Sequence, residues 1–138
     1  MNGSLRKLAI LALCAGVTSA HAEVVAVVSA QSPIGMLTQA QIADVFLGRL
    51  TRLPNGTLAV PLDQPEGSML RDEFYLRMAG KSPAQLKAFW SKLIFTGRGR
   101  PPRALMDSEE ILKAVRNNPA AIGYVERNLA DGSVRILP

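Results

Sequence analysis

Residues 24–29 (VVAVVS) constrain the fold more than any other part of the chain. They form a continuous, mostly β-branched run without the alternation of a half-exposed strand, so they predict a strand covered on both faces. A sheet that is covered on both faces needs helices, and a helix signal follows. Thr38–Gln41 (TQAQ) is a capping box, and it is typical of a helix start. Ile42, Val45 and Phe46 then fall on one face of that helix, and Gly48 is expected to stop it.

The middle of the chain alternates turn, strand and helix signals. Residues 54–56 (PNG) indicate a turn, and residues 57–62 indicate a second strand. A helix is expected after Ser68, and a third helix at Ser82–Gln85 (SPAQ), which combines an N-cap, a proline at the first helical position and a capping glutamine. The apolar positions of this third helix repeat at helical spacing and predict a core face, formed by Leu86, Phe89, Trp90, Leu93 and Ile94.

The last third of the chain completes a mixed α/β pattern. Residues 97–103 (GRGRPPR) hold two glycines and two prolines, which argues against regular structure. Ser108 is expected to cap a further helix that ends at 117–119 (NNP), and residues 121–125 and 134–137 are expected to be strands. The order β-α-β-α-α-α-β-β predicts one domain, a mixed sheet with helices packed on it.

Residues 1–22 have the pattern of a secretory signal peptide. A basic pair, Arg6–Lys7, precedes an apolar run over 8–17 and an A-x-A site ending at Ala22. The alternative, an uncleaved membrane anchor, is disfavoured because the run has about ten residues where a span needs about 20. We therefore expect cleavage after Ala22, a mature domain over residues 23–138, and a periplasmic location.

The mature chain would contain no cysteine and no histidine, because Cys14 and His21 both precede the expected cleavage site. This excludes Ser-His-Asp and Cys-His catalysis, metal sites built on thiolate or imidazole, and disulfides. The adjacent carboxylates Asp72–Glu73 and Glu109–Glu110 project in different directions on their helices, so neither pair can flank one bond. We expect no enzyme, no cofactor and no metal.

Nucleic acid is not an expected partner. The 16 Lys and Arg residues against 11 Asp and Glu give a net charge of +5. Removal of Arg6 and Lys7 would lower it to +3. This charge is modest, and no aromatic residues are interleaved with the bases, so a nucleic-acid surface is not indicated.

Residues 62–71 (LDQPEGSMLR) are the most informative candidate site: a strand end, a glycine turn and a helix start. In open α/β sheets, ligands bind at strand carboxyl ends, where the free N–H groups of a helix's first turn accept an anion. Gly67 lets an anion approach the backbone, the Ser68 hydroxyl can donate to it, and Arg71 supplies a planar pair of donors. The alternative is an ordinary helix in which Ser68 only caps its own backbone, and composition alone favours this alternative.

The same residues resemble a known family. Three segments are similar to the periplasmic phosphate-binding proteins of ABC importers. They are Leu37–Gly48 (LTQAQIADVFLG), Pro65–Ser68 (PEGS) with Phe74, and Ala121–Val125 (AIGYV). In that family a Leu-Thr-x-x-Gln helix ends in Phe-x-Gly, an acidic-Gly-Ser-Gly-Thr turn begins a helix and binds the oxyanion, and Ile-Gly-Tyr-Val is a late strand. The resemblance covers nearly all of the mature chain.

The resemblance implies a single lobe of a type II periplasmic-binding-protein fold that binds phosphate or a similar small anion weakly, with an ABC importer as partner. The implied ligand-binding residues are Gln64, Gly67, Ser68, Met69, Arg71 and Arg98. Family members are longer and close two lobes around the ligand, so pairing of two copies would rebuild the missing lobe.

The loop Arg98–Arg103 (RGRPPR) is the second candidate site. Three guanidiniums on a stiff loop could bind phosphate or an acidic patch on a partner. A solvated loop that keeps the protein soluble explains the same charges equally well. The competing function is therefore a non-catalytic protein–protein interaction module of the cell envelope that uses a truncated solute-binding fold.

Overall fold

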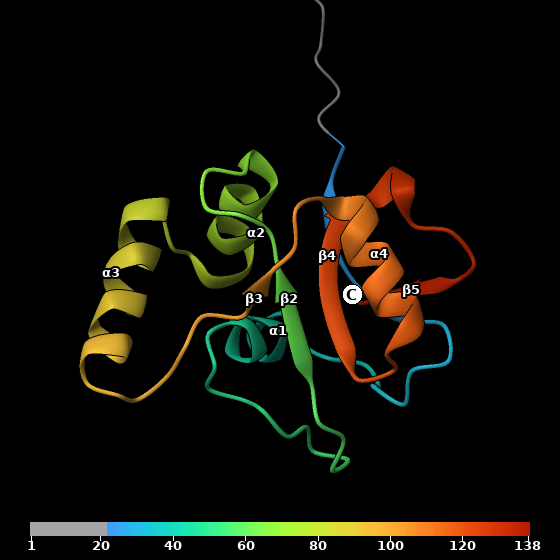
Figure 1. Ribbon diagram of the computed structural model, residues 1–138. Helices are drawn as coiled ribbons and strands as arrows, with labels where there is room; N and C mark the ends of the chain where they lie inside the picture. The colour runs from blue at the N-terminus through green and yellow to red at the C-terminus, as the bar shows by residue number, and fades with distance from the viewer. Residues whose placement is uncertain (1–21) are drawn as a thin grey trace, which may run out of the picture.

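The computed structural model describes residues 22–138 (Figure 1). The signal peptide expected over 1–22 lies outside the described residues, apart from Ala22, and stays a prediction. The elements run in the order β1 (Val24–Ser29), α1 (Gln39–Phe46), β2 (Val60–Asp63), α2 (Met69–Ala79), α3 (Pro83–Phe95), β3 (Arg103–Ala104), α4 (Ser108–Asn117), β4 (Ala121–Glu126), a 3₁₀ turn (Arg127–Leu129) and β5 (Val134–Ile136). The predicted order is confirmed, and β3 and the 3₁₀ turn are additions to it.

The strands form one mixed sheet in the order β3-β2-β4-β1-β5. β2 pairs in parallel with β3 and β4, whereas β1 runs antiparallel to both β4 and β5. This confirms the predicted fold class, a mixed α/β sheet with packed helices. β1 is buried along all six of its residues, as its apolar run predicts.

Each face of the sheet has its own apolar core, because successive side chains of a strand point to opposite faces. Val24, Ala26 and Val28 join the core that α1 and α2 cover, whereas Val25 and Val27 join the core under α4. Figure 1 shows α4 on one face and α1 and α2 on the other. No helix within residues 22–138 has the length and apolar character needed to cross a membrane.

The helix-start predictions at Thr38 and Ser82 are confirmed, and the one at Ser108 is wrong. Thr38 and Ser82 each form a complete capping box. The cap of α4 is instead Asp107, whose side chain accepts from the backbone N–H of Glu110, and Ser108 is the first helical residue. Asp and Ser are nearly equivalent caps, so adjacent candidates cannot be ranked from sequence.

The core face predicted for α3 is only partly correct. Leu86 and Trp90 are buried and Phe89 and Leu93 are partly buried, but the Ile94 prediction is wrong, because this residue is 56% exposed. The reason is the position of α3, which packs against α2 at the side of the molecule instead of over the sheet (Figure 1). A helix at the side of the molecule buries a narrower stripe than its apolar pattern suggests.

The second strand is shorter than its apolar run. The sequence predicts it over residues 57–62, but β2 begins at Val60, because Leu58 forms a separate bridge with Arg52. The parallel strand β2 still ends at Asp63, so the following turn and the start of α2 lie at its carboxyl end.

Candidate functional site

The turn after β2 leads directly into α2. Gly67 has φ +91°, a left-handed conformation that glycine adopts without strain. Ser68 is the N-cap of α2, and its Oγ accepts from the backbone N–H of Arg71 at 3.3 Å. The capping interpretation of Ser68 is therefore correct. Across residues 22–138, the backbone N–H groups of Gly67, Met69 and Leu70 donate to no acceptor, so the helix start keeps free donors in addition to its cap.

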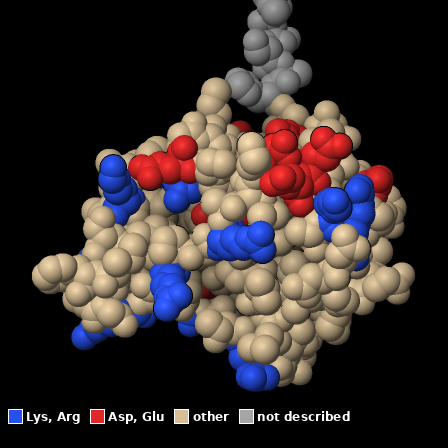
Figure 2. All heavy atoms as spheres, in the orientation of Figure 1, with Lys and Arg blue, Asp and Glu red and all other residues tan. Residues whose placement is uncertain are grey.

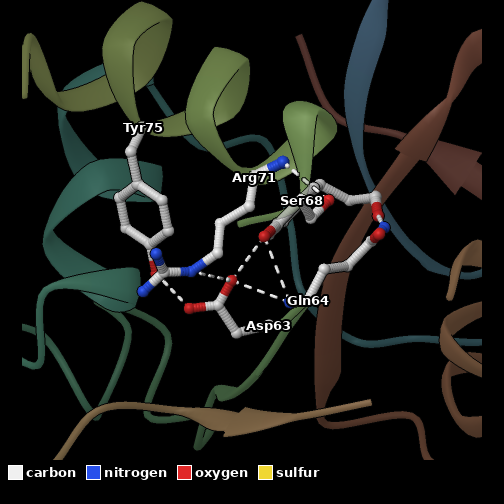
Figure 3. Close-up of polar contacts among 6 residues, drawn as sticks. Asp63, Gln64, Ser68, Arg71 and Tyr75 are labelled. Atoms are coloured by element: carbon white, nitrogen blue, oxygen red, sulfur yellow. Dashed lines mark hydrogen bonds and ion pairs between the residues drawn. The ribbon is translucent and has the colours of Figure 1, made fainter. Parts of the chain in front are cut away.

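A buried polar network lies beneath this turn (Figure 3). Asp63 is buried, and its Oδ2 accepts from the hydroxyl of Tyr75 at 2.7 Å. Its Oδ1 accepts from the hydroxyl of Tyr124 and from the backbone N–H of Gln64, the latter at 2.8 Å. Burial, and then the charge of Asp63, raises the pKa of Tyr75 and of Tyr124 well above the ordinary tyrosine value. Both tyrosines therefore stay protonated and donate to the carboxylate.

Arg71 packs against this network, but the N–H donors of its guanidinium form no hydrogen bonds within the described residues. Its side chain is 12% exposed, and its Nε lies 3.6 Å from Oδ1 of Asp63. Its guanidinium carbon lies 5.3 Å from the centre of the Tyr75 ring. Within the part of the chain that the structure describes, none of its side-chain nitrogens is hydrogen-bonded, and Nε is buried without an acceptor. A guanidinium has five N–H donors, so Arg71 is oriented with its hydrogen-bonding capacity free.

A pocket of about 410 Å³ lies between the start of α2 and α3. It is lined by Glu66, Gly67, Arg71, Asp72, Pro83, Lys87, Trp90, Ser91, Ile94 and Pro101. Trp90 is buried, and its indole N–H has no acceptor in the described residues. The pocket thus joins the glycine of the turn and the free guanidinium of Arg71 to an apolar wall from α3.

The structure brings together only part of the predicted site. Gly67 and Arg71 line the pocket, and Ser68 lies between them in sequence as the cap. Gln64 does not line it: its side-chain amide is buried and donates to Ser108 Oγ and to the Tyr124 carbonyl, both at 3.1 Å. Met69 has an exposed side chain that lines a different hollow.

Arg98 also lines a different hollow, with Gly97 and Arg100, although this hollow shares Ile94 and Pro101 with the pocket. The predicted grouping of Arg98 with Arg71 is therefore not seen. Of the two carboxylates that flank the turn, Asp63 is buried and points inward, whereas Glu66 is exposed beside Lys87, with Oε1 and Nζ 3.7 Å apart. No cluster of three metal-binding side chains occurs within residues 22–138.

Sequence reasoning missed that Lys87 and Trp90 line the pocket. The helical spacing placed Trp90 in the core, which is correct for its burial. Its position at a pocket edge follows from how α3 packs on α2, and no local pattern encodes that. Figure 2 shows the wider charge distribution: acidic side chains gather where α4 begins, and lysines and arginines are scattered singly over this face.

No family model matches the sequence, and a search of curated proteins found no match. Solved structures do match. One is described as a phosphate ABC transporter substrate-binding protein from Clostridium perfringens and was solved with bound phosphate. Its sequence is 22% identical and the TM-score is 0.62, and the match covers 83% of this chain and 43% of that protein. A phosphate transport receptor from Vibrio cholerae is 17% identical with a TM-score of 0.63, covering 83% and 44%.

PstS from Borrelia burgdorferi also matches, at 11% identity and a TM-score of 0.55, covering 83% of this chain and 46% of its own. The chain therefore spans less than half the length of these proteins. Identities this low show the fold alone. The chain is thus a mixed α/β domain with the fold found in part of the phosphate ABC transporter substrate-binding proteins, as the sequence resemblance predicts.

Proposed function

We propose that this chain is a non-catalytic solute-binding domain that binds a small oxyanion, such as phosphate, at the start of α2. The observation that carries the proposal is Arg71: its side chain is 12% exposed, it is oriented by Asp63 and Tyr75, and it has no hydrogen-bond acceptor among the described residues. A buried donor without a partner costs about 1–3 kcal/mol. An oxyanion in the adjoining pocket would supply acceptors to the guanidinium.

The open amide of the turn supports the same ligand. Gly67 lines the pocket, and no described residue accepts from its N–H group, while the first turn of a helix favours negative charge. The fold likeness to proteins named as phosphate transporter receptors agrees with this proposal. Because the pocket is bounded here by one domain alone, water competes for the ligand, and binding is weak.

Isothermal titration of the full chain with phosphate, sulfate and acetate tests the proposal. At least one anion is expected to bind with a Kd in the millimolar range or below, and Arg71→Gln should weaken it at least tenfold. The matched control is Lys113→Gln on α4, an exposed cation that does not line the pocket, which should leave the affinity unchanged. Absence of binding to every anion, or equal loss in both variants, would contradict the proposal.

A periplasmic location is part of the proposal, and it depends on cleavage after Ala22. Cleavage would leave Glu23 as the first residue, and its carboxylate already pairs with Arg77 at 2.6 Å and Arg127 at 2.8 Å. These two arginines hold the pKa of Glu23 below its ordinary value. Mass spectrometry of the protein exported by a Gram-negative host should find a chain that begins at Glu23, whereas an intact N-terminus would contradict secretion by this route.

A second candidate function is docking to an acidic partner protein of the envelope through the end of α3 and the following loop. The observation that favours it is the exposure of Phe95, which is 92% exposed beside the exposed Arg98 and Arg100. Phenylalanine and arginine are both enriched at protein–protein interfaces relative to the rest of the surface. Cross-linking in the envelope should capture a partner that Phe95→Ser with Arg98→Gln and Arg100→Gln loses, while anion titration stays silent.

A further inference from the structure

We propose that the pocket between α2 and α3 takes an organic monoanion, a carboxylate carried on an aromatic or branched apolar body, in preference to inorganic phosphate. The inference rests on the proposed function, because it assumes that an anion binds at Arg71. It goes further by assigning the part of the ligand that Arg71 does not contact.

The size of the pocket is the first argument. Its volume is about 410 Å³, whereas a five-atom oxyanion fills roughly 150 Å³ even at about 30 Å³ for each heavy atom, the share of a water molecule. Pockets for small organic ligands begin at about 300 Å³. A lone phosphate would therefore leave most of this space to water, and a ligand with a body of several carbon atoms would fill it.

The walls of the pocket are the second argument. On the α3 side the apolar surface comes from Trp90 and Ile94, and Pro83 and Pro101 extend it. Ile94 is 56% exposed, although its helical spacing would place it in a core. An apolar ligand body packed on this wall would cover Ile94, so the same contact explains the exposed side chain and the size of the pocket.

The charges around the pocket are the third argument. Arg71 and Lys87 are balanced by Glu66 and Asp72 along the lining. Lys87 already pairs with Glu66, and Asp63 lies behind Arg71. A ligand with one negative charge can accept from the unused N–H groups of Arg71, but a second negative charge would face the carboxylates of Glu66 and Asp72 with no further unpaired cation in the lining to meet it. Such like-charge placement selects against dianions.

Trp90 is the single tryptophan of the chain, so its intrinsic fluorescence reports on this pocket directly. We would titrate the full chain at pH 8 with phenylacetate, acetate, phosphate and the uncharged isostere phenylacetamide. Phenylacetate is expected to bind at least tenfold more tightly than acetate and phosphate, and phenylacetamide at least tenfold more weakly than phenylacetate.

Each other outcome has a distinct meaning. Phosphate binding as tightly as phenylacetate would overturn this inference and leave the proposed function standing. No binding by any anion would overturn both. Phenylacetamide binding as tightly as phenylacetate would also overturn the inference, because the pocket would then be an apolar hollow that does not use Arg71.

Two neighbouring residues of α3 give a matched pair of variants. Ile94→Ser removes part of the wall and should weaken phenylacetate at least threefold without changing acetate. Phe95→Ser changes a side chain that is 92% exposed and does not line the pocket, and it should leave both affinities unchanged. Both residues are exposed, so both variants are expected to fold, which circular dichroism checks. Equal effects of the two variants on phenylacetate would overturn the inference.

Discussion

Among the regions of the molecule that carry arginines, the start of α2 and the loop after α3 differ sharply in their surroundings. At the start of α2, Arg71 lies against the buried carboxylate of Asp63 and the ring of Tyr75, with its side chain 12% exposed. In the loop after α3, Arg98 and Arg100 are exposed, and their side chains form no ion pair or hydrogen bond with any residue in the range 22–138. The residue type is the same in both places.

The comparison indicates which region suits a small ligand. A side chain already fixed by its neighbours loses little conformational entropy on binding, whereas each free arginine costs about 0.5–1.5 kcal/mol to immobilise. Arg71 is oriented by groups on β2 and α2 before any ligand arrives. The loop arginines would have to be ordered by their partner, which a large surface can offset and a small anion cannot.

The largest expected effect comes from removing the group that fixes Arg71. Asp63→Asn leaves the guanidinium of Arg71 buried without a counterion and deprives Tyr75 and Tyr124 of a charged acceptor. Breaking one partner of a buried ion pair typically costs about 3–5 kcal/mol. Urea denaturation at pH 7 should therefore show a loss of about 3 kcal/mol in the free energy of unfolding.

Asp44→Asn is the matched control. Asp44 pairs with Arg49 at 3.7 Å, close to the separation in the buried pair, but both side chains are about half exposed. Exposed pairs contribute about 0–1 kcal/mol, so this variant should unfold almost like the parent. A similar loss of unfolding free energy in the two variants would show that the buried pair of Asp63 and Arg71 contributes no more than an exposed ion pair.

The same network predicts a pH dependence. Tyr75 and Tyr124, the only two tyrosines of the chain, have raised pKa values in the folded protein because they are buried beside Asp63. Above about pH 10 the unfolded chain loses both protons while the folded chain keeps them. Unfolding then releases protons. The two tyrosines therefore leave the free energy of unfolding unchanged below about pH 10, and above it each lowers that free energy by about 1.4 kcal/mol per pH unit.

Tyrosinate absorbance and circular dichroism, followed together in an alkaline titration, check this dependence. Both tyrosines are expected to ionise only as the protein unfolds. Ionisation of either tyrosine near pH 10 with the fold intact would mean that its hydroxyl is open to water, and the support of Arg71 by a buried network would then be wrong.

Local signals in the sequence predicted the elements but not this network. The strand over 24–29 and the capping boxes at Thr38 and Ser82 depend on neighbours in sequence, and the structure confirms them. The contacts of Asp63 with Tyr75 and Tyr124 join residues 12 and 61 positions apart. Such contacts depend on how β2, α2 and β4 come together, which no spacing along one element encodes.

The candidate site was predictable to the same limited extent. The strand end followed by a glycine and a helix start placed Gly67 and Arg71 at one site, because the carboxyl end of a parallel strand fixes where a ligand can lie. The wall from α3 could not be predicted, since Trp90 and Ile94 have the same helical spacing as core residues. Only the packing of α3 beside α2, away from the sheet, separates the buried Trp90 from the exposed Ile94.

A smaller effect is expected from the helix caps, and two of them can be compared. Ser68 and Ser82 accept from the backbone three residues on, at 3.3 and 3.2 Å. Changing either to alanine should cost about 1 kcal/mol of stability. Only Ser68→Ala should also weaken anion binding, measured by titration, because Ser68 caps the helix start that is proposed to hold the anion. Equal anion affinity in the two variants would remove Ser68 from the site and leave it as a cap.

The smallest effects are expected in the loop after α3. Arg98→Gln and Arg100→Gln should each change the free energy of unfolding by less than about 0.5 kcal/mol, since neither side chain is buried or paired in the described structure. Anion affinity should also stay unchanged, because neither arginine lines the pocket. A severalfold loss of affinity in Arg98→Gln would mean that the loop closes over the pocket when the anion binds. Arg98 would then belong to the site after all, as the sequence resemblance implies. The contrast between the fixed Arg71 and the free Arg98 would then hold only for the protein without a bound anion.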